Sequence, residues 1–218
     1  MFDLHCHSIF SDGEFIPAEL WRRVQALNYE AIAITDHVDQ SNFEQVIKSL
    51  LKFKQSVQGK APIFIVGVEL THVPPDLIPE LIRECRKAGA ELIVVHGETI
   101  AEPVAQGTNL AGIEGGADIL AHPGLITEEE VKLAVKKGVF LEISARKGHC
   151  LTNGHVVSLA KMYGANLVIN SDAHSPTDLM NKDLAIKVGL GAGLTLEEVE
   201  RIWNIARDRL IKPILTKK

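Results

Sequence analysis

Seven short apolar runs alternate with longer helix-like segments along this chain, and this rhythm most constrains its fold. The runs are β-branched and apolar on both sides, which is typical of parallel strands covered by helices. Repeated right-handed βαβ units form either a doubly wound sheet or a closed barrel, and the pattern alone does not separate the two. The expected strands are residues 2–5, Ala31 to Thr35, Ile63 to Val68, Leu92 to Val95, Asp118 to Ala121, Val139 to Ser144 and Leu167 to Asn170.

Helical patterns fill the intervals between these runs. Thr127 with Glu130, and Thr195 with Glu198, have the spacing of capping boxes, which mark helix starts. Because no linker, repeat or low-complexity tract interrupts the 218 residues, we expect one α/β domain over residues 1–218. The expected helices are residues 17–28, 41–57, 76–89, 99–115, 127–137, 153–164, 178–189 and 195–211.

Nearly every expected strand is followed at once by a His, Asp or Glu. In barrels and open α/β sheets the site lies at the carboxyl ends of the strands, so these side chains are expected to converge. Several acids and imidazoles in one pocket need a cation to offset their repulsion. The residues in question are His5, His7, Asp12, Asp36, His37, Glu69, His96, His122, Glu142, Asp172 and His174.

His5 and His7 form the most informative pair. Side chains alternate along a strand, so both imidazoles project the same way if the strand continues through Cys6. Two imidazoles on one face are a natural chelate for a borderline metal. Asp172 and His174 offer a carboxylate and an imidazole by the same logic.

Composition narrows the class of partner. Hydrophobic residues make up 46% of the chain and charged residues 23%, enough for a sizeable core and a charged surface. The net charge of -5 argues against a long nucleic-acid backbone as the main partner, because such binders usually carry a basic excess. A small phosphorylated substrate is compatible with this negative net charge, because bound divalent ions can make the local charge at the site positive.

Cysteine usage and hydropathy bear on location. The three cysteines form no even disulfide framework and no C-x-x-C pair, which indicates a reducing cytoplasm. The N-terminus has no basic region followed by an apolar run, so no signal peptide is predicted. No uncharged stretch approaches the roughly 20 residues that span a bilayer. We therefore predict a cytoplasmic protein with no membrane partner, while the sequence is silent on oligomeric state.

The ordered set of motifs resembles the polymerase and histidinol phosphatase (PHP) family of metal-dependent phosphoesterases. No fragment is decisive alone, but the order from position 5 to position 174 is specific. The matching pieces are His5-Cys6-His7-Ser8, Ser11-Asp12-Gly13, Thr35-Asp36-His37, Gly67-Val68-Glu69, Ala121-His122-Pro123 and Asn170-Ser171-Asp172-Ala173-His174. The resemblance implies a distorted (β/α)7 TIM-like barrel with two or three divalent metal ions, zinc, manganese or iron.

The resemblance also implies how the ligands divide among the ions. The first ion would take His5, His7, Glu69 and Asp172. The second would share Glu69 and add His96 and His122. The third would take Asp12, His37 and His174. Asp12 stands where some members have His, a change that could weaken the third site or alter its metal preference.

The activity implied is that of a phosphoric monoester hydrolase, which cleaves a phosphate ester of a small metabolite by attack of metal-bound hydroxide. Histidinol phosphate is the substrate suggested by family analogy. Arg146 is expected to donate hydrogen bonds to the phosphate oxygens. His149 is expected to bind the substrate or to protonate the leaving oxygen. Asp36 is expected to orient a ligand imidazole, with a helix-capping role as the alternative. Glu142 is expected to be an acid of the barrel interior.

Two other functions stay open. A nucleotide or oligonucleotide phosphoesterase, such as an exonuclease, would use the same metal site but needs base-stacking aromatics, and only 5% of residues are aromatic. A non-catalytic barrel subunit would be expected to lack several ligands, whereas all nine positions here carry residues able to bind metal.

Overall fold

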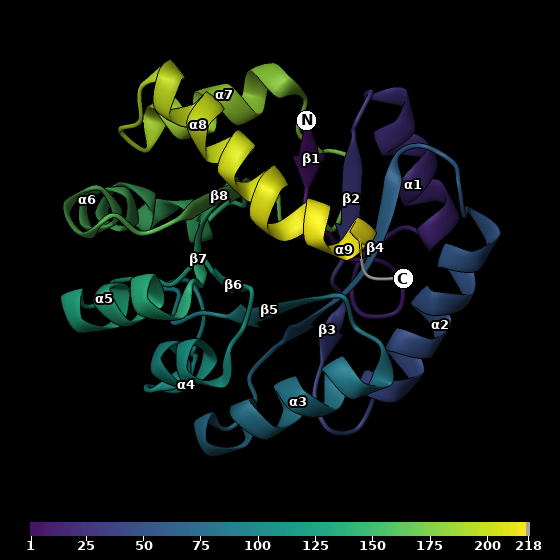
Figure 1. Ribbon diagram of the computed structural model, residues 1–218, viewed down its shortest axis with the longest axis horizontal. Helices are drawn as coiled ribbons and strands as arrows, with labels where there is room; N and C mark the ends of the chain where they lie inside the picture. Colours follow the sequence, from purple (N-terminus) through teal and green to yellow (C-terminus); the bar gives the residue numbers. More distant parts are fainter. Residues whose placement is uncertain (217–218) are drawn as a thin grey trace.

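The structure, a computed structural model that describes residues 1–216, is a nearly closed parallel barrel surrounded by helices (Figure 1). The strand order is β1-β2-β4-β5-β6-β7-β8, with the short β3 beside β4. The expected distorted (β/α)7 barrel is therefore confirmed, and the doubly wound alternative is wrong. The strands are β1 (Phe2–Asp3), β2 (Ala31–Ile34), β3 (His37–Val38), β4 (Ile63–Leu70), β5 (Leu92–His96), β6 (Ile119–Ala121), β7 (Phe140–Ser144) and β8 (Leu167–Asn170).

The seam between β1 and β8 closes the barrel. Just beyond the two strands, Cys6 and Ala173 form an isolated parallel bridge. At the carboxyl end of β8, the side-chain oxygen of Asn170 accepts a hydrogen bond from the backbone N–H of Leu4 at 3.0 Å. The carboxyl ends of the first and last strands consequently lie side by side, and His7 and Asp172, which are 165 positions apart, share one mouth.

Helices cover the outside of the barrel because each buries one apolar stripe against the strands. Leu20 and Val24 of α1 are buried, as are Val46, Ile47 and Leu50 of α2, and each such side chain contributes roughly 1.5–3 kcal/mol. The helices are α1 (Pro17–Ala26), α2 (Phe43–Ser56), α3 (Ile78–Ala88), α4 (Thr108–Gly115), α5 (Glu128–Lys137), α6 (Asn153–Tyr163), α7 (Lys182–Gly191), α8 (Leu196–Ala206) and α9 (Lys212–Thr216), with short segments η1 (Pro75–Leu77), η2 (His149–Thr152) and the π-helical η3 (Arg207–Ile211).

Helix starts follow the predicted capping chemistry. Thr127 and Thr195 each accept a hydrogen bond from the backbone N–H three residues on, and the glutamates there bond back, so both capping boxes are confirmed. The helix expected over 178–189 begins later, at Lys182, because the Asn181 side chain caps it.

The C-terminal helical segment α8-η3-α9 crosses the amino-terminal end of the barrel, opposite the mouth (Figure 1, yellow). Arg207 Nε lies 2.9 Å from a carboxylate oxygen of Glu30, just before β2, and its guanidinium stands over the ring of Phe2 in β1. Leu210 and Ile211 are buried there. This segment closes the base of the barrel and leaves the other end for chemistry.

The helix expected over residues 99–115 is only partly correct, since α4 is confined to its second half. The residue before Pro103 is biased away from the helical backbone. In addition, the carboxylate of Glu98 accepts a hydrogen bond from the N–H of Asn109 at 2.9 Å, near the start of α4. Residues 97–107, here called the β5–α4 loop, therefore run over the mouth of the barrel in an irregular path.

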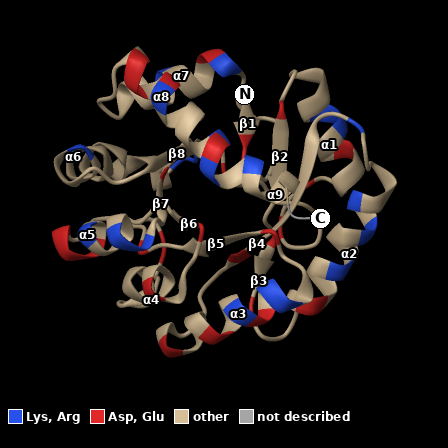
Figure 2. Cartoon of the chain, viewed as in Figure 1, with Lys and Arg blue, Asp and Glu red and all other residues tan. Residues whose placement is uncertain are grey.

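The outer surface carries mixed charge. Lys and Arg are dispersed over the outer helices α2, α3, α5 and α8 among Asp and Glu, and acidic positions also lie near the centre of the barrel (Figure 2). Of the helices within residues 1–216, none combines the length and the apolar character needed to cross a bilayer.

Gly124 should be far less replaceable than Gly116. Both have positive φ (63° and 83°), where alanine costs about 1–2 kcal/mol. A Cβ on Gly124 would overlap the carbonyl oxygen of Glu98 in the β5–α4 loop, whereas at Gly116 the described residues leave open space. We expect Gly124→Ala to lower the free energy of unfolding by about 1–3 kcal/mol more than Gly116→Ala, measured by urea denaturation. Equal losses would show that the loop does not pack tightly there.

Candidate metal centre

The carboxyl ends of the strands bring all nine predicted ligands to one mouth. His5, His7 and Glu69 are fully buried, while Asp12 is half exposed at the rim. Each comes from a strand end or from the loop that follows it, as parallel barrels require. The nine residues are His5, His7, Asp12, His37, Glu69, His96, His122, Asp172 and His174.

The first group lies deepest in the barrel. His5 Nε2 is 3.2 Å from Glu69 Oε1, and His7 Nε2 is 3.3 Å from Asp172 Oδ1. With metal–nitrogen bonds of about 2.0–2.1 Å, donor atoms of a tetrahedral or octahedral shell lie about 3.0–3.4 Å apart. The measured separations are thus those of donors around a shared ion.

A second group surrounds His122. Its Nε2 lies 3.6 Å from Glu69 Oε1 and 3.6 Å from Asp172 Oδ2. The ring of His96 lies edge-on at 4.5 Å between centroids, and that of His149 stacks at 4.1 Å. His96, His122 and His149 offer nitrogens close enough together to share one ion.

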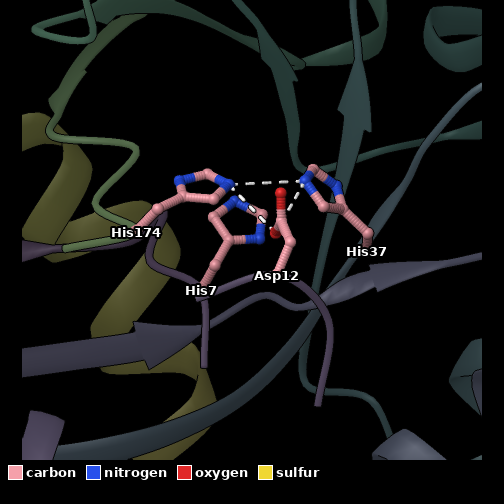
Figure 3. A group of neighbouring side chains, drawn as sticks. All are labelled: His7, Asp12, His37 and His174. Carbon is pink, nitrogen blue, oxygen red and sulfur yellow. Dashed lines mark hydrogen bonds and ion pairs between the residues drawn. The ribbon is translucent and has the colours of Figure 1, made fainter. Parts of the chain in front are cut away.

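The third group is the most exposed, and Figure 3 shows its side chains pointing toward one another. Asp12 Oδ1 is 3.1 Å from His174 Nε2 and 3.4 Å from His37 Nε2. The two imidazole Nε2 atoms are 3.5 Å apart. His7 completes the group, so its ring lies between the first and third groups.

Unsatisfied buried atoms indicate that these residues fit a divalent ion. Within residues 1–216, His5 Nε2, both ring nitrogens of His7, Glu69 Oε1 and His122 Nδ1 have no hydrogen-bond partner. Leaving such a group unsatisfied costs about 1–3 kcal/mol. A cation would satisfy the atoms that face the cluster, and mixed nitrogen and oxygen donors suit zinc, manganese and iron alike.

Burial and neighbouring charges shift the pKa values of the groups at the mouth in both directions. Burial raises the pKa of Asp172 to about 7. Burial alone would also raise the pKa of Glu69, but the imidazoles of His5 and His37 hold it well below its usual range. Burial lowers the pKa of His122 well below its ordinary value. A neutral imidazole and an ionised carboxylate are the forms that metals bind, and a cation would hold Asp172 ionised too.

Glu142 orients His5 from inside the barrel, in agreement with its expected interior position. Its Oε2 accepts a hydrogen bond from His5 Nδ1 at 2.8 Å and another from Asn170 Nδ2 at 2.9 Å. The bond to Nδ1 fixes the tautomer that leaves Nε2 free to face Glu69.

Asp36 does not bond an imidazole, contrary to expectation. Its carboxylate accepts hydrogen bonds from the backbone N–H of Ser8 at 2.7 Å, the hydroxyl of Ser8 at 2.8 Å and the hydroxyl of Ser11 at 2.8 Å. The side chain is directed at the loop after His7 because that loop crosses the end of β2. Asp36 therefore holds the loop that carries Asp12.

Arg146 and His149, from the loop after β7, both line the cavity at the mouth, which has a volume of about 230 Å³. Arg146 Nη1 donates to the backbone carbonyl of Asp172 at 3.2 Å. The Nδ1 of His149 pairs with the hydroxyl of Thr99 at 2.8 Å, which turns Nε2 toward the cavity. The structure thus brings both predicted residues to the metal groups.

The backbone is strained at the ends of two strands. His122 and Asp172 have φ of 28° and 55°, values that a non-glycine residue rarely adopts. Such residues cost about 1–3 kcal/mol each and cluster at functional sites. Here the strained residues are two of the predicted ligands.

Glu102 is a site residue that the sequence analysis missed. Its Oε2 lies 3.2 Å from His96 Nε2 and 3.4 Å from His72 Nε2, and its Oε1 lies 3.5 Å from His149 Nε2. It lies inside the helix expected over residues 99–115, where no metal donor is predicted. Pro103, directly after it, was the available signal that this segment leaves the helical path.

A parallel barrel with imidazoles and carboxylates gathered at its carboxyl mouth defines the class of metal-dependent hydrolases built on TIM-like folds. The PHP domain family matches residues 3–178, which is most of the chain. The chain belongs to the PHP family of metal-dependent phosphoesterases, and the predicted resemblance is confirmed.

Two curated relatives differ in how much of them the chain matches. The uncharacterized protein MJ1295 of Methanocaldococcus jannaschii is 48% identical over 216 residues, which cover 98% of this chain and 99% of that protein. The DNA polymerase/3'-5' exonuclease PolX of Bacillus subtilis is 26% identical over 198 residues, and the match covers 79% of this chain but 34% of PolX.

Solved structures share the fold at low sequence identity. The histidinol phosphate phosphatase HISK of Lactococcus lactis, solved with zinc, L-histidinol and phosphate, has a TM-score of 0.62 and 15% identity, covering 91% of this chain and 93% of that one. A Xaa-Pro dipeptidase has a TM-score of 0.62 and 11% identity, covering 95% and 74%. At such identities the likeness supports the barrel alone.

Glu142→Gln should weaken metal binding without unfolding the barrel. Glutamine can still accept from His5 Nδ1, so the ring stays oriented while the charge that raises its basicity is lost. We expect about a 10–100-fold loss of affinity for at least one ion, measured by titrating metal-free protein in a calorimeter. Glu14→Gln, at an exposed rim position, is the control and should bind like the unaltered protein. Matching affinities in all three proteins would refute the role.

Proposed function

We propose that the chain is a metal-dependent phosphatase that hydrolyses a phosphate monoester of a small metabolite. The observation that carries this proposal is the convergence of nine donors at the mouth of the barrel, where six of them line a cavity that Arg146 also lines. At about 230 Å³ the cavity is smaller than most drug-sized ligand pockets, which favours a small substrate.

Two or three zinc, manganese or iron ions would occupy the mouth. In this proposal the first ion is held by His5, His7, Glu69 and Asp172. The second is held by Glu69, His96 and His122. The third is held by Asp12, His37 and His174. When bound, such ions supply Lewis-acid charge to phosphoryl oxygens and lower the pKa of water for attack on phosphorus.

The chain's own residues would bind the substrate and move a proton. Nη1 of Arg146 lies 3.2 Å from the carbonyl oxygen of Asp172 and 2.6 Å from Nδ1 of His174, so the N–H groups of Nε and Nη2 are the ones that can fork onto phosphoryl oxygens. His149, held at Nδ1 by Thr99, presents Nε2 to the cavity and can give a proton to the leaving oxygen. Asp36 contributes by holding the loop that carries Asp12.

Histidinol phosphate is the first substrate to test. The support is the fold shared with HISK, a histidinol phosphate phosphatase solved with L-histidinol and phosphate. The second candidate is a nucleotide or oligonucleotide phosphoesterase, favoured by the 26% identity to PolX. Assays of histidinol phosphate, sugar phosphates, nucleoside phosphates and a short single strand, side by side, separate the two. Cleavage of the strand with no release of phosphate from the monoesters would overturn the first candidate.

We also propose that residues 1–218 act as one domain, because α7 and α8, which lie beyond the family match, pack against β8. Lys217 and Lys218 lie outside the described residues. The cytoplasmic location remains a prediction from the cysteine content.

Removal of metal should abolish activity reversibly. After dialysis against a chelator we expect phosphatase activity to fall to background and to return on addition of zinc, manganese or ferrous ions. Circular dichroism should show the barrel still folded, because its core is independent of the mouth. Full activity in protein shown by elemental analysis to be metal-free would refute a metal-dependent mechanism.

Asp172→Asn and His122→Ala should each lower turnover by at least ~100-fold while the unfolding transition remains cooperative. Each removes a donor from the deepest groups. The matched controls are Asp183→Asn, at an exposed position of α7, and His155→Ala, whose ring bonds the carbonyl of Ile126. Near-normal turnover in either site variant would remove that residue from the scheme.

A further inference from the structure

The contacts of Glu102 are those of a donor to a cation. Its carboxylate lies within 3.5 Å of imidazole nitrogens from His96, His149 and His72. These three rings come from β5, the start of η2 and the loop after β4. Separations of 3.2 and 3.5 Å, to His96 and His149, match the edges of a coordination shell with bonds near 2.1 Å.

The hydrogen bond of His96 to its neighbour directs its other ring nitrogen at Glu102. His96 Nδ1 lies 3.1 Å from the carbonyl oxygen of Gly97, which can only accept, so Nδ1 is the donor. The Nε2 of His96 faces the oxygen of Glu102 at 3.2 Å. A metal ion between them would be bound by both atoms.

The protein holds Glu102 and His149 in place before any ion binds. The β5–α4 loop is fastened by Glu98, whose carboxylate accepts from the N–H groups of Gly107 and Asn109 at 2.9 Å. Thr99 of the same loop pairs with His149 Nδ1 at 2.8 Å. One loop thus positions both side chains, as expected of a built ligand set rather than of a chance surface ion pair.

We propose that Glu102 and His149 complete the coordination of the ion held by His96 and His122. The group of three imidazoles, His96, His122 and His149, already lies close enough to share one ion, and Glu102 adds a carboxylate from the solvent side. This inference rests on the proposed metal centre and adds two ligands to it. It also replaces the proposed role of His149 as proton donor, because Nε2 is the nitrogen left free by Thr99 and, once bound to an ion, it carries no proton to give. The β5–α4 loop then supplies, through Glu102, the ligand that completes the coordination shell of this ion at the rim of the cavity.

The test uses cobalt(II) as the probe, because its visible absorption reports the number and type of its ligands. Metal-free protein is titrated with cobalt near neutral pH, and the bound ions are counted by elemental analysis and their affinities measured by calorimetry. Glu102→Gln, His149→Gln and the double variant are compared with the unaltered protein. Glu14→Gln and His155→Gln are the matched controls, at an exposed rim position and on α6.

We expect each site variant to lower the affinity for one cobalt ion by at least tenfold and to change the visible absorption of that ion. The affinities for the remaining ions, and all affinities of the control variants, should be unchanged. The effects in the double variant should be less than additive, since both residues would act on the same ion. If the unaltered protein binds cobalt and the variants match it in affinity and spectrum, this inference fails while the metal centre stands. A rise in KM alone, with an unchanged spectrum, would instead make Glu102 a substrate contact and overturn the assignment. Failure of the unaltered protein to bind cobalt, zinc, manganese or ferrous ions would refute the metal centre itself.

Discussion

The burial of imidazoles and carboxylates without hydrogen-bond partners among the described residues is the constraint on which the mouth of the barrel depends. His5, His7, Glu69 and Asp172 are almost wholly withdrawn from water, and several of their polar atoms lack partners within residues 1–216. Protein chains avoid such an arrangement unless a cation offsets it, because each unsatisfied buried group destabilises the fold by about 1–3 kcal/mol. The rest of the structure can be understood as the scaffold that holds these groups in place despite that cost.

The scaffold does this with three carboxylates that are not predicted ligands. One bonds the ring nitrogen of an imidazole that points away from the cluster, and two bond loops. Glu142 fixes the ring of His5, Asp36 fastens the loop that carries Asp12, and Glu98 fastens the loop that carries Glu102. Each is buried or half-buried, where a charged hydrogen bond is strong. The left-handed backbone at His122 and Asp172 adds strain, which persists only because the surrounding structure holds these residues in place.

Much of this arrangement was predictable because it depends on local pattern. Alternating apolar runs and helical stretches predicted seven strands and most helices, and the two threonine–glutamate pairs predicted two helix starts. Placement of the nine predicted ligands at the mouth followed from the rule that parallel strands present their carboxyl ends on one side. The errors lie where a contact distant in sequence outweighs a local signal. Asp36 bonds Ser8 and Ser11 rather than an imidazole, and Glu98 binds the start of α4, which leaves Glu102 outside any helix.

The sequence by itself determined the fold class, the family and the identity of the residues that could meet at the mouth, because periodicity and motif order are properties of neighbouring positions. Only the tertiary structure decided which of those residues touch. The closure of β1 against β8 sets His7 beside Asp172, and the path of the β5–α4 loop brings Glu102 against His96 and His149. Such contacts join positions up to 167 residues apart, and their geometry depends on how the whole barrel packs, which no local pattern encodes.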